Sequence, residues 1–458
     1  MSVEEKFLGA VYDEDDDDEG EGSYLIWRRK QREKMRRKNE ATIGGFLGKS
    51  PKTTAVGIMP SYYGALLSWA VRRHIERDGW KVVDTLGYRD PEPFYIDVST
   101  DYDKHENLLM RGQLLVEKDG TRFVVTIEVH PRCDGSVQVQ GLEEHREAGE
   151  SFVNGVMTIA REENFYRGKR IEFAGRIRFL NVKERSWDSI VLDSATKKEI
   201  RANTIQFLRN REHWSQYGIP QKRGVLLAGE PGTGKTLICK ALMAEAEGIT
   251  CITTHAYDLC EDEYITELYE LADDLAPCIV FIEDIDLIGL NREEYHYQHG
   301  PALLALLNVL DGVEERHAIV TVATTNSLEA LDKALSHRPS RFDRVIKLSL
   351  PSLGERKRLV ELLCQRIPVN ERIQDYIASK AENCTPVQLQ EIVYSLAIEH
   401  AGEGAQNGST YLELSKDDVD HAIAKVNGRN KRRLGFEIEN NRGDGRAVYI
   451  QPPEETGC

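Results

Sequence analysis

The chain has 458 residues, of which 40% are hydrophobic and 30% are charged, a balance typical of a soluble globular protein with roughly two to four domains. Its net charge of −16 argues against a protein that coats nucleic acid over its whole surface, although a local basic groove is compatible with it. No apolar run approaches the roughly 18 residues that a membrane-spanning helix needs, and the N-terminus lacks the features of a secretory signal. Eight cysteines lie scattered without a CxxC pair. We therefore expect reduced thiols, no membrane partner and a cytoplasmic location.

The first 51 residues carry two blocks of opposite charge. An acidic block, DEDDDDEGE, fills residues 13–21, and a basic block, RRKQREKMRRK, fills residues 28–38. Because blocks of like charge repel themselves and stay solvated, we expect residues 1–51 to form a charged, disordered tail. The alternative is a basic arm that grips nucleic acid or an acidic partner and is masked by the acidic block.

Residues 52–185 have the mixed pattern of a small α/β domain. Apolar side chains recur at helical spacing over residues 61–79. Two apolar runs over residues 112–130 meet at Asp119-Gly120, a pair typical of a tight hairpin turn. The domain carries no recognisable chemistry, and its position alone suggests an adaptor or client-docking role.

The first motif with chemical meaning is RGVLLAGEPGTGKT, residues 223–236, which precedes a helical pattern that we expect to end at Gly248. The GxxxxGK[ST] spacing is that of a phosphate-binding loop, because its glycines let the backbone turn sharply and point N–H groups at phosphate oxygens. Lys235 is expected to reach the β- and γ-phosphates, and Thr236 to offer its hydroxyl to Mg²⁺. The candidate nucleotide-binding residues are Gly229, Glu230, Pro231, Gly232, Thr233, Gly234, Lys235, Thr236 and Leu237.

Two later apolar runs end in polar residues. IVFIEDID, residues 279–286, ends in the adjacent carboxylates Glu283 and Asp284, and IVTVATTN, residues 319–326, ends in Asn326. Because ligands bind at the carboxyl ends of strands in open α/β sheets, we expect all three side chains at the phosphate loop. The acid pair is unusual, since ATPases mostly place aspartate before glutamate.

Arginines and a helical segment complete the pattern. RPSRFDR, residues 338–344, offers Arg338, Arg341 and Arg344 to an anionic partner. Guanidinium groups suit the charge of a phosphoryl transition state because they are planar and permanently charged. An alternating pattern over residues 352–427 predicts a small helical domain.

Taken in this order, residues 186–427 resemble the AAA ATPases. The reversed acid pair and LLNVLDGV at 306–313 are similar to the subgroup that contains the mitochondrial translocase of the folded Rieske iron-sulfur protein. The resemblance implies an α/β fold with a P-loop parallel sheet and flanking helices over 186–351, a helical lid over 352–427 and a tail over 428–458. It also implies ATP and Mg²⁺ as cofactors, and a homo-oligomeric ring, usually a hexamer, that remodels protein clients in a chaperone-like manner.

The resemblance also implies roles for single residues. Asn326 matches the family's first sensor, and Gly218 matches the backbone position that borders adenine. Arg341 and Arg344 match the two arginine fingers that act on ATP in the neighbouring subunit.

Reversed acid pairs occur in working relatives, so Glu283 is implied to hold the hydrated Mg²⁺ and Asp284 to polarise the attacking water. Glu283 is one methylene longer than aspartate, and a metal contact through a water can absorb that length. Asp284 is correspondingly shorter and would reach the attacking water less directly. We therefore expect a slow but working ATPase.

Two features depart from the family pattern. Members that thread clients place an aromatic, an apolar residue and a glycine after the second strand, whereas residues 254–274 contain no such triplet. Tyr257 or Tyr264 could line a pore, although a tyrosine on a helix more often packs. We therefore favour switching or remodelling of folded clients over threading. The second departure is Ser340, which replaces the glycine usual before the finger arginine.

Three classes of function stay open on these residues. The leading one is an ATP-driven protein remodeller. The second is a nucleic-acid-associated motor or loader that uses the basic block 28–38, and the third is an ATP-binding scaffold with negligible turnover because of the reversed acids. The sequence shows no HExxH motif, so we do not expect a fused peptidase.

Overall fold

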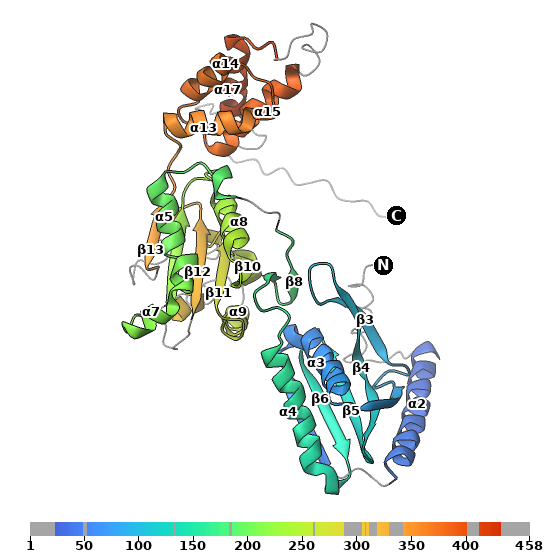
Figure 1. Ribbon diagram of the computed structural model, residues 1–458. Coiled ribbons are helices and arrows are strands. Elements are labelled where there is room, and N and C mark those ends of the chain that lie inside the picture. Colours follow the sequence, from blue (N-terminus) through green and yellow to red (C-terminus); the bar gives the residue numbers. More distant parts are fainter. Residues whose placement is uncertain are drawn as a thin grey trace, which may run out of the picture. The chain divides into compact units, whose positions relative to one another are not determined.

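The computed structural model describes residues 23–48, 53–131, 133–182, 186–259, 262–287, 305–306, 308–310, 318–328, 342–400 and 412–431. The chain divides into two compact units, residues 1–349 and 350–458 (Figure 1). Within the described ranges, no helix is both long enough and apolar enough to cross a membrane.

The first unit opens with a long helix, α2 (Ser23–Leu47), where the sequence predicted a disordered tail over residues 1–51. For the helical residues that prediction is wrong, because side chains in the last turns of α2 pack against the N-terminal sheet. Leu47 is 6% exposed, and the Asn39 side chain is buried and donates Nδ2 to the Gly87 carbonyl at 2.9 Å.

An antiparallel sheet of six strands follows in the order β1-β6-β5-β4-β2, with β3 also paired to β4. The predicted hairpin at Asp119-Gly120 is confirmed, because Lys118 pairs with Thr121 across the turn and Gly120 has a φ of +83°. The strands are β1 (Thr53–Met59), β2 (Lys81–Leu86), β3 (Phe94–Ser99), β4 (His105–Lys118), β5 (Thr121–His130) and β6 (Cys133–Gly141).

Two helices cover one face of this sheet, α3 (Gly64–Arg77) and α4 (Arg146–Glu162) (Figure 1). Both are amphipathic, and their apolar sides join the strands in one core. Two short 3₁₀ turns, η1 (Ser61–Tyr63) and η2 (Glu143–His145), precede them.

A second sheet has seven strands in the order β13-β9-β12-β11-β10-β7-β8. It is parallel except for β8, which is antiparallel to β7. This confirms the predicted α/β class with a parallel P-loop sheet. The strands in chain order are β7 (Arg170–Phe173), β8 (Ile177–Phe179), β9 (Lys222–Ala228), β10 (Thr250–His255), β11 (Cys278–Glu283), β12 (Ile319–Thr325) and β13 (Arg344–Lys347).

The predicted domain boundary between residues 185 and 186 is wrong in one respect. Strands β7 and β8 precede that boundary, yet β7 pairs with β10 and belongs to the second sheet. Their short, mixed sequences give no periodic signal that would assign them to one sheet or the other.

Apolar residues on both sides of the second sheet explain why its central strands read as unbroken hydrophobic runs. In β11, Ile279 and Phe281 face a core shared with α5, α6 and α8, whereas Val280 and Ile282 face a core shared with α9. The elements around this sheet are η3 (Trp187–Ser189), α5 (Ser194–Ala202), α6 (Ile205–Arg209), α7 (Arg211–Gln216), α8 (Lys235–Glu245), η4 (Ala256–Leu259) and α9 (Asp262–Asp274). Helix α8 ends at Glu245, before the predicted stop at Gly248.

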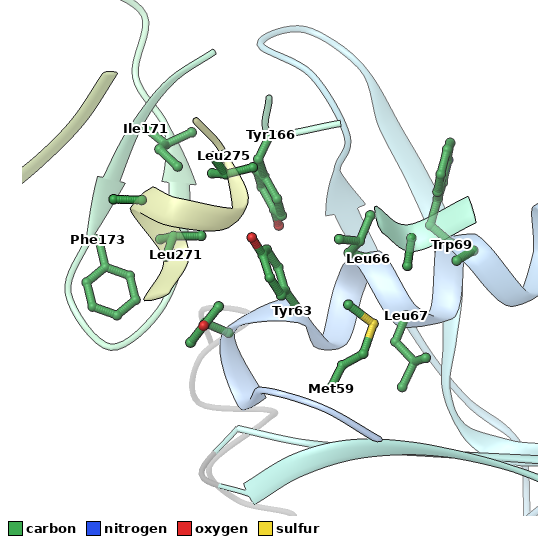
Figure 2. Close-up of a cluster of buried hydrophobic side chains, with 14 of the residues drawn as sticks. Met59, Tyr63, Leu66, Leu67, Trp69, Tyr166, Ile171, Phe173, Leu271 and Leu275 are labelled. Atoms are coloured by element: carbon green, nitrogen blue, oxygen red, sulfur yellow. The ribbon is translucent and has the colours of Figure 1, made fainter. Parts of the chain in front are cut away.

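One apolar cluster joins the two sheets within the first unit. Tyr63 of η1 stacks on Tyr166, with 6.2 Å between ring centroids, and Leu271 of α9 belongs to the same cluster (Figure 2). An ion pair adds to this contact, because Lys169 Nζ lies 2.7 Å from both carboxylate oxygens of Asp101. Helix α9 therefore packs on its own sheet and shares one apolar cluster with Tyr63 and Tyr166 (Figure 2).

The second unit is a helical bundle with its own core. Its helices are α13 (Leu353–Cys364), α14 (Glu371–Lys380), α15 (Pro386–His400) and α17 (Lys416–Lys431). Ser352 and Glu355 form a capping box at the start of α13. The buried Arg356 guanidinium donates to the carbonyls of Pro351 and Ala378 at 2.9 and 2.8 Å. The last helix extends four residues beyond the predicted end of the lid at 427.

Candidate functional site

The loop between β9 and α8 needs its three motif glycines for two different reasons. Gly232 and Gly234 have φ angles of +86° and +99°, a region that residues with a side chain rarely adopt. Gly229 does not have a positive φ, but a Cβ there would lie 2.7 Å from the Leu348 carbonyl oxygen. Gly234 is also the N-cap of α8 and provides no side-chain cap, so the first N–H groups of α8 are free to bind an anion.

The remaining loop residues close or flank the turn. Thr233 Oγ1 donates to the Glu230 carbonyl at 2.8 Å, which ties the two ends of the loop together. Pro231 is exposed at the tip, and Leu237 packs its side chain against the core beneath α8.

The Lys235 side chain is held inside this loop. It is 7% exposed, and its Nζ donates to the carbonyls of Gly229 and Glu230 at 2.7 and 3.2 Å. Burial lowers the pKa of the Lys235 ammonium below its usual value, and the carboxylates of Asp284 and Asp286 oppose that shift. A phosphate in the loop would take hydrogen bonds from this ammonium in competition with the two carbonyls.

Sheet register brings the ends of β9 and β12 together. Ala228 lies opposite Thr325, and the Gly229 N–H donates to the Thr325 carbonyl at 3.2 Å. The next residue of β12, Asn326, therefore emerges beside the phosphate loop.

Asn326 connects the lysine to one of the two acids. Its Oδ1 accepts from Lys235 Nζ at 2.7 Å, and its Nδ2 donates to Asp284 Oδ1 at 2.9 Å. Its backbone N–H donates to Asp286 Oδ1 at 3.1 Å. Both ends of the Asn326 amide are thus used, which fixes its orientation and the position of one Asp284 oxygen.

Asp284 sits in an unusual backbone conformation. Its φ is +56°, and its N–H donates to Thr324 Oγ1 at 3.0 Å. Aspartate is several-fold enriched in this left-handed region, because its short polar side chain is tolerated there. The reversed order of the acids therefore has a conformational reason, since the second position favours aspartate over glutamate.

Glu283 and Thr236 supply the two oxygens suited to Mg²⁺. Thr236 Oγ1 donates to Glu283 Oε2 at 3.1 Å. Mg²⁺ in nucleotide sites binds one or two protein oxygens and fills its other positions with phosphate oxygens and waters, so this pair fits it. Among the residues that the structure describes, no group of three or more His, Cys, Asp or Glu side chains could hold a metal ion.

Five predicted site residues thus lie together: Lys235, Thr236, Glu283, Asp284 and Asn326. Sequence reasoning missed two neighbours of this group. Asp286, 6% exposed, was visible as the last acid of IVFIEDID, and Thr324 precedes Asn326 by two residues. Both side chains accept hydrogen bonds from backbone N–H groups of site residues. A sequence motif shows which side chains are present, but it does not show which backbone groups they bind.

Other predicted residues lie elsewhere. Gly218 follows α7 and has a φ of +66°. Arg344 is exposed at the start of β13, where it pairs with Val225 of β9. Val225 lies three residues before Ala228, at which β9 ends and the phosphate loop begins. Arg338, Ser340 and Arg341 lie outside the described residues.

The two candidate pore tyrosines have different surroundings. Tyr257 on η4 is 78% exposed. Tyr264 on α9 packs against the apolar cluster of the first unit. Of the two, Tyr257 presents its ring to solvent.

Comparison with known proteins identifies relatives of about half the chain. Residues 225–350 match the family model described as "ATPase family associated with various cellular activities (AAA)". The ATP-dependent zinc metalloprotease FtsH 3 of Sphaerobacter thermophilus is 33% identical over 238 residues, which are 50% of this chain and 47% of that protein. The chloroplastic/mitochondrial ATP-dependent zinc metalloprotease FTSH 11 of Arabidopsis thaliana is 33% identical over 231 residues, 49% of this chain and 28% of that protein.

A relative without a metalloprotease name is also similar. The proteasome-activating nucleotidase of Sulfurisphaera tokodaii is 33% identical over 245 residues, which are 51% of this chain and 60% of that protein. The chain therefore spans less than two thirds of each of these relatives. The AAA ATPase domain predicted from the motifs is confirmed for residues 225–350.

The close approach at Gly229 gives a first prediction. Gly229→Ala should weaken nucleotide binding at least about tenfold and lower the thermal unfolding midpoint, because the new methyl group would push the loop away from the Leu348 carbonyl. Titration with a fluorescent ATP analogue and thermal denaturation measure both effects. Gly354→Ala is the matched control, since a Cβ there meets nothing within 4 Å. Equal binding by the Gly229→Ala protein and the unmodified protein would contradict this account of the loop.

Proposed function

We propose that this chain, which carries an ATPase domain of the AAA family, hydrolyses ATP and uses the cycle to remodel protein clients. The observation that carries the proposal is the continuous set of hydrogen bonds from Lys235 through Asn326 to Asp284. It joins a phosphate-binding ammonium to a carboxylate that lies at the same edge of the sheet.

The proposed roles follow from these contacts. Lys235 and the first N–H groups of α8 bind the phosphates, and Asp284 accepts a hydrogen bond from the attacking water with the oxygen that Asn326 leaves free. Thr236 and Glu283 would hold Mg²⁺, which would supply positive charge to offset the negative charge of the phosphates. Asn326 keeps the lysine and the acid in fixed register, and such positioning is the main protein contribution to phosphoryl transfer.

We further propose that the active form is a homo-oligomeric ring, most simply a hexamer. The position of Arg344 supports this, because it is exposed at the start of β13, opposite Val225, and not at the strand end that leads into its own phosphate loop. Arg341 and Arg344 would then supply guanidinium groups to the nucleotide of the neighbouring subunit, where they stabilise charge in the transition state.

Protein clients are favoured by the names of the relatives, which describe metalloproteases and a proteasome-activating nucleotidase. Tyr257, which is exposed on η4 directly after β10, is the proposed client contact. Without a neighbouring glycine or a second aromatic, one exposed ring per subunit suits a brief grip on a folded client.

The separate roles of lysine and acid give a second prediction. Lys235→Ala should lose ATP affinity, because it removes the phosphate contact, whereas Asp284→Asn should bind ATP and stall before hydrolysis. Asparagine tolerates the positive φ at this position, so the backbone is kept. Nucleotide titration and phosphate release measure the two steps, with the exposed Glu247→Gln as control. Turnover at the unmodified rate in the Asp284→Asn protein would remove Asp284 from the water-activating role.

The assignment of the metal ligand gives a third prediction. Glu283→Gln should raise the Mg²⁺ concentration needed for half-maximal turnover, because the amide keeps the hydrogen bond from Thr236 but loses the negative charge. Glu283→Asp should preserve much of the Mg²⁺ response. Phosphate release over a Mg²⁺ series makes the comparison, and an unchanged requirement in Glu283→Gln would mean that the roles of the two acids are exchanged.

Ring assembly gives a fourth prediction. Specific activity should rise with protein concentration as the ring forms, and Arg341→Ala should lower turnover by about 10³–10⁵ while leaving ATP binding measurable. Light scattering alongside the activity assay tests this, with the exposed Arg366→Ala as control. A monomer whose activity is independent of concentration and of Arg341 would refute the ring.

A further inference from the structure

Strand β11 leaves the sheet at Asp284, and one residue of the neighbouring strand β12 accepts two of the hydrogen bonds at that point. The Asp284 N–H donates to Thr324 Oγ1 at 3.0 Å, and the Ile285 N–H donates to the Thr324 carbonyl at 2.9 Å. Thr324 is 2% exposed. Its hydroxyl and its carbonyl therefore hold two consecutive N–H groups of the turn that follows β11.

The Thr324 hydroxyl takes a place that a backbone carbonyl fills in a regular ladder. The pairing of β11 with β12 begins with the Cys278 N–H, which donates to the Ala318 carbonyl at 2.9 Å. In a parallel ladder the donors of one strand recur at every second residue, so regular pairing would bring the Asp284 N–H to the Thr324 carbonyl. The Ile285 N–H binds that carbonyl instead. Without the Thr324 hydroxyl, the Asp284 N–H would lose its acceptor.

The left-handed conformation changes the direction of the Asp284 side chain. Val280 and Ile282 of β11 face the core shared with α9, and because successive side chains of a strand alternate between its faces, a regular Asp284 would continue this row. The φ of +56° breaks the alternation, and the carboxylate accepts from Asn326 Nδ2 at 2.9 Å. The turn therefore brings the carboxylate to Asn326, which also accepts from Lys235.

We propose that Thr324 is a positioning residue for ATP hydrolysis. By accepting the Asp284 N–H, its hydroxyl holds Asp284 in the left-handed conformation and keeps the carboxylate at Asn326, where it meets the attacking water. This role rests on the proposed function, in which Asp284 activates that water. Because Thr324 acts through the backbone of Asp284, loss of its hydroxyl should slow hydrolysis and leave ATP binding intact.

The first test compares kcat with the KM for ATP. Thr324→Val keeps the shape of the side chain but removes the acceptor, so kcat should fall at least about tenfold while KM and ATP affinity change less than about twofold. Thr324→Ser keeps the hydroxyl and should retain kcat within about threefold. Phosphate release and titration with a fluorescent ATP analogue measure these quantities. An unchanged kcat in Thr324→Val, or a Thr324→Ser protein that is equally slow, would overturn the proposal.

Thr321→Val is the matched control, because it removes a buried hydroxyl from the same strand without touching the acids. Thr321 is 2% exposed, and its Oγ1 lies 2.7 Å from the hydroxyl oxygen of Tyr269. The kcat of this variant should stay within about twofold of the unmodified protein. An equal loss of kcat in Thr321→Val and Thr324→Val would mean that the Thr324 hydroxyl only stabilises the sheet, and the positioning role would fall.

A double mutant tests whether the hydroxyl acts through Asp284. If it does, adding Thr324→Val to Asp284→Asn should lower the residual single-turnover hydrolysis less than about twofold. Losses that multiply would contradict the proposal. Hydrolysis by Asp284→Asn at the full rate would refute the proposed role of Asp284, and the role of Thr324 with it. A stalled Asp284→Asn protein beside a normal Thr324→Val protein would refute the role of Thr324 alone.

Amide hydrogen exchange tests the same hydrogen bond without turnover. Because its acceptor is removed, the Asp284 N–H should exchange at least about tenfold faster in Thr324→Val than in the unmodified or Thr321→Val protein. Mass spectrometry with fragmentation that resolves single amides measures the rates. Equal rates in all three proteins would show that the hydroxyl does not hold this N–H, and would overturn the proposal whether or not the chain hydrolyses ATP.

Discussion

The hydrogen bonds of the Asn326 side chain are the constraint on which the site depends. One amide holds the Lys235 ammonium on one side and the Asp284 carboxylate on the other. An ammonium and a carboxylate joined through a neutral amide keep a fixed separation, so neither collapses onto the other as a direct ion pair. The space between them is where a phosphate and a water would meet.

The sheet supplies the precision of this arrangement. Central strands that are apolar on both sides are fixed by two cores, and a shift of one residue in any of them would exchange the two faces. Because β9, β11 and β12 end at one edge in fixed register, the residues that follow each strand inherit that register. The packing of the two cores therefore fixes the strand register, and the strand register fixes the positions of the site residues at the edge of the sheet.

Much of this was predictable from the sequence, and the exceptions have physical causes. The phosphate loop, the acid pair and Asn326 could be placed because each follows a long apolar run, and long runs are reliable signals of buried strands. The left-handed backbone at Asp284 could not be predicted, because residue type alone does not fix φ, which also depends on how the chain leaves β11. Helix α2 was missed because charge repulsion predicts a solvated chain, whereas Asn39 and Leu47 gain contacts that become visible only when the N-terminal sheet is present. Strands β7 and β8 were assigned to the N-terminal domain because β10, the partner of β7, is about 80 residues away in sequence.

The place of β7 in the second sheet has a consequence for modularity. The family match begins at residue 225, yet the sheet continues through β10 to β7. Helix α9 also shares an apolar cluster with Tyr63 and Tyr166, which precede the match. A fragment cut at the family boundary would leave β10 as an unpaired edge and would bare apolar side chains of α9, such as Leu271, both of which favour aggregation. The unit that can be transferred to another protein is therefore larger than the residues that match the family. Any exchange of the N-terminal part would have to change α9 at the same time.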